Sequence, residues 1–131
     1  MVCVKMTEEI IKIVIPFQTP SVNHLWGQRG FRKFLTKEAK ELKEKIYLLV
    51  PNCKFGKNTK LAVNMDVYED WFTKKNEIKK KDLDNKSKFV LDSIFEKLGV
   101  DDKQIFELTM KKIFEEDFNK YKTIITIKEI K

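Results

Sequence analysis

Four short segments of the chain have the pattern of β-strands. The first is rich in β-branched residues, and in the other three apolar residues occupy every second position, the period of a half-buried strand. These segments are 10–15, 61–68, 106–110 and 123–127. Pro16 and Pro20 follow the first segment and predict a loop over about 16–35. A polar turn at 115–120 joins the last two strands, which are expected to form a hairpin.

Two other segments have apolar residues at helical spacing. The first runs from Thr36, a suitable N-cap, to Val50, where Pro51 stops it. The second runs from about Asp84 to Leu98 and ends at Gly99, a natural terminator. On this second helix Phe89 falls outside the apolar stripe, which predicts an exposed aromatic side chain. Such a residue is either an ordinary surface aromatic or part of a dimer contact. The apolar residues of the two stripes are Ala39, Leu42, Ile46, Leu49, Val50, Val90, Leu91, Ile94, Phe95 and Leu98.

The order of these elements is β-α-β-α-β-β, which predicts an α+β fold. Four strands and two helices are enough for one mixed four-stranded sheet with both helices packed on a face. The chain has 131 residues, the length of one ordinary domain. We therefore expect a single domain over 1–131.

The composition excludes several classes of protein and several types of catalytic or binding site. The apolar runs are too short to span a bilayer, and the N-terminal segment lacks the features of a secretory signal, so we expect a soluble, cytoplasmic protein. Cys3 and Cys53 have no metal-ligand spacing and are expected to be reduced thiols. His24 is the only histidine, and the four glycines form no phosphate-binding loop. Any catalysis must then depend on carboxylates and lysines.

The chain is basic, with 27 Lys and Arg against 20 Asp and Glu and a net charge of +7. The excess is concentrated at 74–81, which holds five lysines and one glutamate, and at 29–37, which holds no acid. Basic patches favour phosphate-rich partners, although a solvated lysine-rich surface has the same composition. The candidate nucleic-acid-binding residues are Arg29, Arg32, Lys33, Lys74, Lys75, Lys79, Lys80 and Lys81.

Five aspartates surround the second predicted helix, directly after the lysine run. Like charges repel, so such a cluster is costly unless a cation lies among them. Carboxylates bind Mg²⁺, and a nearby lysine offsets charge on a phosphate, so these parts suit phosphodiester hydrolysis. The acids at the two helix ends would meet only if the following strand returns beside the helix. The aspartates are Asp82, Asp84, Asp92, Asp101 and Asp102.

The same residues also suit purely structural roles. Asp82 or Asp84 could cap the helix, Asp84 and Lys88 have the spacing of an i,i+4 ion pair, and Asp101 with Asp102 could form a turn.

The motif KDLDNKSKFVLDSI, followed by GVDDKQI, resembles the signature of the RusA-type Holliday junction resolvases. TPSVNHLW at 19–26 is similar to the N-terminal loop of that family. The resemblance implies an α+β fold and a homodimer that uses Mg²⁺ to introduce paired nicks across four-way DNA junctions in recombination and repair.

Matched position by position, the resemblance implies a role for each residue of the site. Asp82, Asp84 and Asp102 would be the catalytic, metal-binding carboxylates, with Asp101 as the alternative to Asp102. Lys88 would be the catalytic lysine that stabilises the phosphate or orients the attacking water. Lys81 would contact the DNA backbone, and Asp92 would have a structural role. Trp26 suits either base stacking at the junction or core packing.

Two other kinds of protein fit the same residues. One is a non-catalytic module of the same fold that binds branched nucleic acid. The other is an oligomeric assembly factor whose lysines bind an acidic protein. Within nucleases, cleavage of flaps or forks is also compatible with these residues.

Overall fold

The computed structural model describes residues 10–19, 26–29, 32–53 and 55–130; for 26–29, 32–35 and 85–86 only the backbone is described. Its main element is a four-stranded mixed sheet in the order β1-β6-β4-β5. The strands are β1 (Ile10–Ile15), β4 (Leu61–Glu69), β5 (Ile105–Phe114) and β6 (Lys122–Glu129). β4 and β5 run parallel, and the other neighbours are antiparallel. This confirms the predicted mixed sheet.

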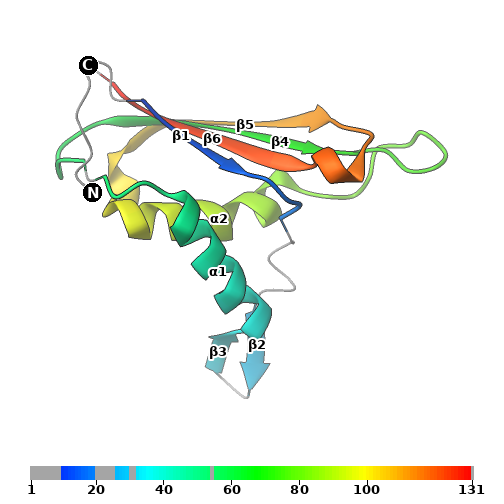
Figure 1. The fold of residues 1–131 in the computed structure, drawn as a ribbon, viewed down its shortest axis with the longest axis horizontal. Coiled ribbons are helices and arrows are strands. Elements are labelled where there is room, and N and C mark those ends of the chain that lie inside the picture. Colours follow the sequence, from blue (N-terminus) through cyan, green and yellow to red (C-terminus); the bar gives the residue numbers. More distant parts are fainter. Residues whose placement is uncertain (1–9, 20–25, 30–31, 54, 131) are drawn as a thin grey trace.

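Both predicted helices form and lie on the same face of the sheet (Figure 1). The helix α1 spans Lys37–Leu49, with Thr36 accepting a hydrogen bond from the Ala39 N–H at 3.2 Å as its N-cap. The helix α2 spans Leu83–Leu98 and connects the parallel strands β4 and β5. A connection between parallel strands has to cross back over the sheet, so α2 runs opposite to both of them. The α+β single domain is confirmed.

The predicted hairpin between the last two strands is wrong. β5 and β6 do not pair, because β6 inserts between β1 and β4. The 3₁₀ turn η3 (Phe118–Lys120) lies in their connection. The reason for the order is burial: Ile125 and Ile127 of β6 are fully buried in the sheet centre, whereas most of β5 is exposed.

The predicted loop over 16–35 also contains structure that the sequence did not indicate. Strands β2 (Trp26–Arg29) and β3 (Arg32–Leu35) form a separate antiparallel pair. The pair projects away from the main sheet, beyond the N-terminal end of α1 (Figure 1). Its four-residue strands have no clear apolar alternation, so the periodicity that reveals longer strands is missing here.

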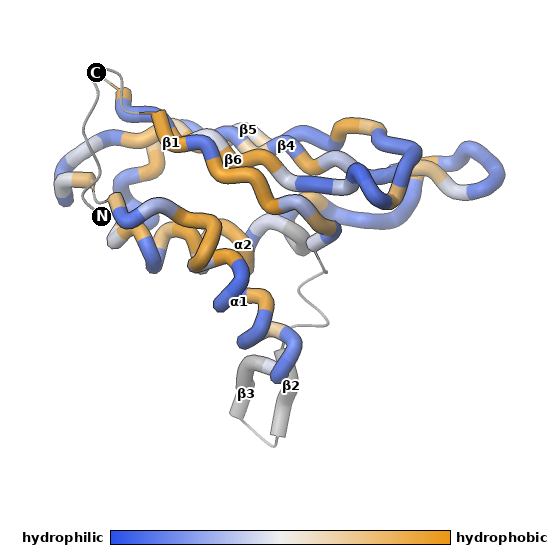
Figure 2. Tube along the Cα trace, viewed as in Figure 1, coloured by the Kyte–Doolittle hydropathy of each residue, from blue (hydrophilic) through white to orange (hydrophobic). Residues whose placement is uncertain are grey.

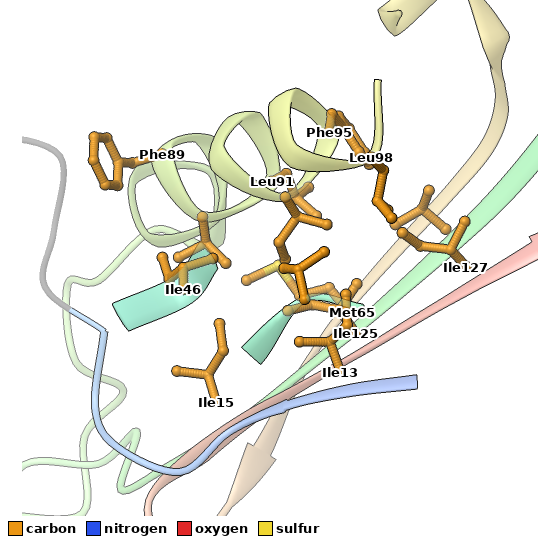
Figure 3. Packing of buried hydrophobic residues seen from close by; sticks show 14 of the residues in the cluster. Ile13, Ile15, Ile46, Met65, Phe89, Leu91, Phe95, Leu98, Ile125 and Ile127 are labelled. Carbon is orange, nitrogen blue, oxygen red and sulfur yellow. The ribbon is translucent and has the colours of Figure 1, made fainter. Parts of the chain in front are cut away.

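The core lies between α2, α1 and the sheet. Alternate residues of β4 point to the helices and are buried, while their neighbours face the other side. Leu91 and Leu98 of α2 point towards Met65 and Ile127 of the sheet (Figure 3). Apolar residues are frequent along both helices and along β1 and β6 (Figure 2). This packing fixes where the two ends of α2 lie.

The prediction that Phe89 is exposed is wrong, because its side chain is 7% exposed. α2 is covered on two sides: the sheet covers one, and α1 covers a second. Lys43 of α1 pairs with Glu96 at 2.6 Å, and the Lys97 ammonium donates to the Tyr47 carbonyl at 3.0 Å. Among the residues of α2 whose side chains the structure describes, Asp84, Lys88 and Asp92 are exposed at i,i+4 spacing and form what is here called the charged stripe.

The expectation of two reduced cysteines is contradicted. Cys53 is disulfide-bonded, and the only other cysteine in the sequence, Cys3, lies outside the described residues. In the part of the chain that the structure describes, no helix is long and apolar enough to cross a membrane.

Candidate active site

Two carboxylates stand at the N-terminal end of α2. Asp82 occupies the N-cap position, yet its side chain makes no capping hydrogen bond. Asp84 lies in the first turn, and both side chains are exposed. A structural cap would use the Asp82 carboxylate to bind a backbone N–H of that turn. The geometry therefore leaves these carboxylates directed at solvent or a ligand, close to the positive end of the helix dipole.

The C-terminal end of α2 leads into the second acidic pair. Gly99 ends the helix in the left-handed conformation (φ 67°), which turns the chain towards the 3₁₀ turn η2 (Asp102–Gln104). Asp101 caps this turn by accepting from the Lys103 N–H at 3.2 Å. The Gln104 side chain accepts from the Asp101 N–H at 3.0 Å and donates to the Gly56 carbonyl at 2.8 Å. Asp101 thus has a structural function, which favours Asp102 as the ligand.

Charge interactions connect Asp102 to the charged stripe. Burial raises the pKa of Asp92 above its usual value, repulsion from Asp102 raises it further, and Lys88 lowers it. Asp102 therefore lies near enough to Asp92 to affect its ionisation.

The predicted metal ligands lie at opposite ends of α2. Asp82 and Asp84 stand at its start, whereas Asp102 follows its end and lies near enough to Asp92, in the second half of the helix, to affect the ionisation of Asp92. Among the described residues, no three carboxylate, histidine or cysteine side chains are grouped closely enough to hold a metal ion. A single chain consequently presents the predicted acids in two separate groups.

Glu69, which the sequence analysis did not identify, lies beside the first of these groups. It ends β4 on the helix-facing side of the sheet and is 1% exposed. Its Oε1 accepts a hydrogen bond from the Gln18 amide at 3.1 Å and lies 3.7 Å from the Lys81 ammonium. Because Lys81 directly precedes Asp82, this ion pair connects the segment that leads into α2 to the sheet. The one sequence feature that could have identified Glu69 is its charge at a position of β4 where the alternation predicts a buried, helix-facing side chain.

Glu69→Gln is expected to reduce any cleavage by roughly tenfold, because the loss of one charge weakens the attachment of Lys81 next to Asp82. The measurement is the single-turnover cleavage rate together with the affinity for uncleaved DNA. If Glu69 contributes only to folding, the variant should instead have a lower melting temperature, and its cleavage rate should equal that of the wild type at temperatures where both are folded. Glu129→Gln, a change of the same charge on β6 away from this site, serves as the control.

A lysine-rich segment at 70–80, here called the basic loop, connects β4 to the same end of α2. It is a small hairpin in which Phe72 bridges to Ile78 and the Lys79 N–H donates to the Trp71 carbonyl at 2.8 Å. Trp71 is buried, and its indole N–H donates to the Ile113 carbonyl at 3.1 Å. The loop extends past the end of the sheet (Figure 1). Lys74, Lys75 and Lys80 are exposed on it, and Lys79 is half-buried.

The other predicted basic residues lie on the β2–β3 pair. Arg29 and Arg32 are backbone partners across this pair, and Lys33 follows on β3. Their side chains are outside the described part of the structure, as is that of Trp26. Their contribution to a nucleic-acid surface stays a prediction.

Comparison with known families agrees with this arrangement. The family model of the endodeoxyribonuclease RusA matches residues 16–128. The match includes both ends of α2, the basic loop, β4, β5 and β6 except its last residue, whereas β1 lies before it. A search of curated proteins found no match. Because the family model covers most of its length, the chain belongs to the RusA family of endodeoxyribonucleases.

Proposed function

We propose that the protein is a Mg²⁺-dependent endonuclease that resolves four-way DNA junctions by paired symmetric nicks, in recombination and repair. The observation that carries the proposal is the N-terminal end of α2, where Asp82 occupies a cap position without making the cap hydrogen bond and Asp84 stands one turn before Lys88. The lysines of the basic loop precede this group directly. Family membership supports nuclease activity and branched DNA as the partner.

The carboxylates suit a Mg²⁺ ion. Mg²⁺ prefers oxygen ligands and keeps several of its waters, so two or three carboxylates are enough to hold it. Asp82 and Asp84 would hold it from one side. When bound, Mg²⁺ supplies a water of lowered pKa and positive charge for the phosphate oxygens.

The remaining roles belong to basic side chains of this chain. Lys88 projects from the charged stripe one turn after Asp84, where its ammonium would pair with the negative charge that develops on the scissile phosphate. The exposed lysines of the basic loop would bind neighbouring phosphates and set the direction of the DNA across the site. Lys81, paired with Glu69, would contribute mainly to positioning.

We propose that two subunits complete each site. In the described part of its own chain, Asp102 is not grouped with Asp82 and Asp84 closely enough to hold a metal ion, so it would act with these residues in a partner. A twofold dimer then contains two equivalent sites, each with the partner's Asp102. Such symmetry matches a four-way junction, in which two phosphates are cut at related positions.

The second candidate is a non-catalytic module that binds branched nucleic acid with the same surface. The unused Asp82 cap argues against it, since binding DNA gives no reason to keep carboxylates exposed beside lysines.

The test is cleavage of a synthetic four-way junction by the wild type and Asp82→Asn, with and without Mg²⁺, with linear duplex as control. We expect symmetric nicks only with the wild type, Mg²⁺ and the junction. Junction binding without any Mg²⁺-dependent cleavage would favour the non-catalytic module. No salt-sensitive binding of junction DNA would instead indicate the assembly factor.

A further inference from the structure

The strand β5 forms one edge of the sheet and is unusually open for an edge. In the described part of the chain it pairs only with β4, so the hydrogen-bonding groups of its other edge face outwards along ten residues. Long uncovered edges invite pairing with another chain, and proteins normally block them. Leu108 on the helix-facing side is 50% exposed, and Phe106 and Phe114 are also exposed. Both features indicate that a partner covers this edge.

We propose that the partner is a second copy of the chain, paired antiparallel through β5 about a twofold axis at Thr109. This inference rests on the proposed function, because it names the surface that brings the two halves of each site together. The two sheets would then form one continuous eight-stranded sheet. Such pairing is isologous, so a single strand supplies both halves of the interface.

The side chains of β5 are complementary to themselves in this arrangement. Glu107, Thr109 and Lys111 share the outer face of the sheet, since they lie beside Ala62, Asn64 and Asp66 of β4. With Thr109 on the axis, Glu107 faces the partner's Lys111 and Lys111 faces the partner's Glu107. Opposite charges at facing positions stabilise a strand pair, and like charges destabilise it.

The helix-facing side is complementary as well. Leu108 and Met110 lie beside the buried residues Val63 and Met65 of β4. In the same register Leu108 faces the partner's Met110, so two apolar pairs would extend the existing core across the axis. Burial of this exposed apolar surface supplies the attraction that the charged pairs alone lack.

The geometry also connects the separated acids. Antiparallel pairing places the start of β5 against the end of the partner's β5. Asp102 lies just before that start, and Asp82 lies near that end, because Glu69, which pairs with Lys81, is beside Phe114. Asp102 of one chain would therefore lie on the side of the partner's Asp82 and Asp84.

The position of the charged stripe agrees with this arrangement. α1 packs over β1 and against one side of α2, whereas α2 lies over the centre of the sheet and contacts β5. The charged stripe is the side of α2 that neither α1 nor the sheet covers, so it faces the β5 edge. In the proposed dimer the two stripes would face each other antiparallel across the axis, and Lys88 would lie between the two acidic groups.

A cysteine cross-link tests the surface. Facing residues of an antiparallel pair have Cα atoms about 4.5–5.5 Å apart, within the range of a disulfide. Thr109→Cys is expected to form a covalent dimer in non-reducing electrophoresis after mild oxidation, and that dimer should still cleave junctions. Lys12→Cys, an exposed outer-face position on the opposite edge strand β1, is the matched control and should stay monomeric, as should the wild type.

Charge reversal gives a second measurement that does not depend on oxidation. Glu107→Lys sets like charges against each other twice per dimer and should raise the dimer dissociation constant roughly tenfold in sedimentation. Adding Lys111→Glu should restore it. The β5 interface would be refuted if the protein cuts junctions as a dimer but forms the covalent dimer through Lys12→Cys. It would also be refuted if neither charge change alters the dimer dissociation constant. Either result would leave the proposed function intact. A monomer that cuts junctions would overturn both the interface and the shared site.

Discussion

Asp84→Asn is expected to reduce junction cleavage at least about a thousandfold while junction binding stays within about threefold of the wild type. The change removes one negative oxygen from the group at the start of α2 and keeps the size and helical position of the side chain. Asp84 is exposed and carries no described ion pair, so the fold should be unaffected. The measurements are the single-turnover cleavage rate with Mg²⁺ and the affinity for the junction without Mg²⁺.

Glu96→Gln is the matched control for this experiment. It removes the same charge from an exposed position three helical turns later, where Glu96 pairs with Lys43 on α1. Cleavage should remain close to the wild-type rate. Equal losses in the two variants would mean that α2 needs its overall charge rather than a carboxylate at position 84, which would contradict the proposed role.

Replacing Lys74, Lys75 and Lys80 of the basic loop by Gln is expected to weaken junction binding roughly a hundredfold at 50 mM salt. Each lysine that neutralises a phosphate releases a counterion, so the plot of log affinity against log salt should become less steep by about 3 for each subunit. The rate at saturating DNA should fall much less, because these lysines lie outside the acidic group. Titrations at several salt concentrations measure both quantities.

The control for the loop changes three exposed lysines elsewhere, Lys37, Lys40 and Lys57, to Gln. This variant has the same net charge as the loop variant. If binding depends only on total charge, both variants will lose the same affinity and the same salt slope. A loss confined to the loop variant would place the DNA path along the end of the sheet.

Periodicity predicted the main elements because each has a long, regular apolar pattern. β4 alternates over nine residues, and α1 has both a cap at Thr36 and a stop at Pro51. α2 ends where Gly99 predicted. Strand order is not visible in such patterns: β6 pairs between β1 and β4 because that position buries Ile125 and Ile127, a property of the assembled sheet. The short β2–β3 pair has too few residues to show a period.

The candidate site could be recognised from sequence only in part. The motif identified Asp82, Asp84, Lys88 and Asp102, but the spacing could not show that α2 separates them or that Asp101 caps η2. Phe89 was misplaced because a helical wheel has one apolar side, whereas α2 is buried by both the sheet and α1. Glu69 was missed because its contacts with Gln18 and Lys81 join residues far apart in sequence.

Mixing two inactive variants tests the central claim most directly. Asp82→Asn and Asp102→Asn should each be inactive as pure dimers. If the two variants are co-expressed in equal amounts, half of the dimers will contain one chain of each variant. Each mixed dimer would have one complete site, in which Asp82 of one chain acts with the partner's Asp102. About a quarter of wild-type nicking should then return, as single nicks rather than paired ones. If the mixture stays as inactive as its parents although mixed dimers form, the acids do not act across two subunits and the account is wrong.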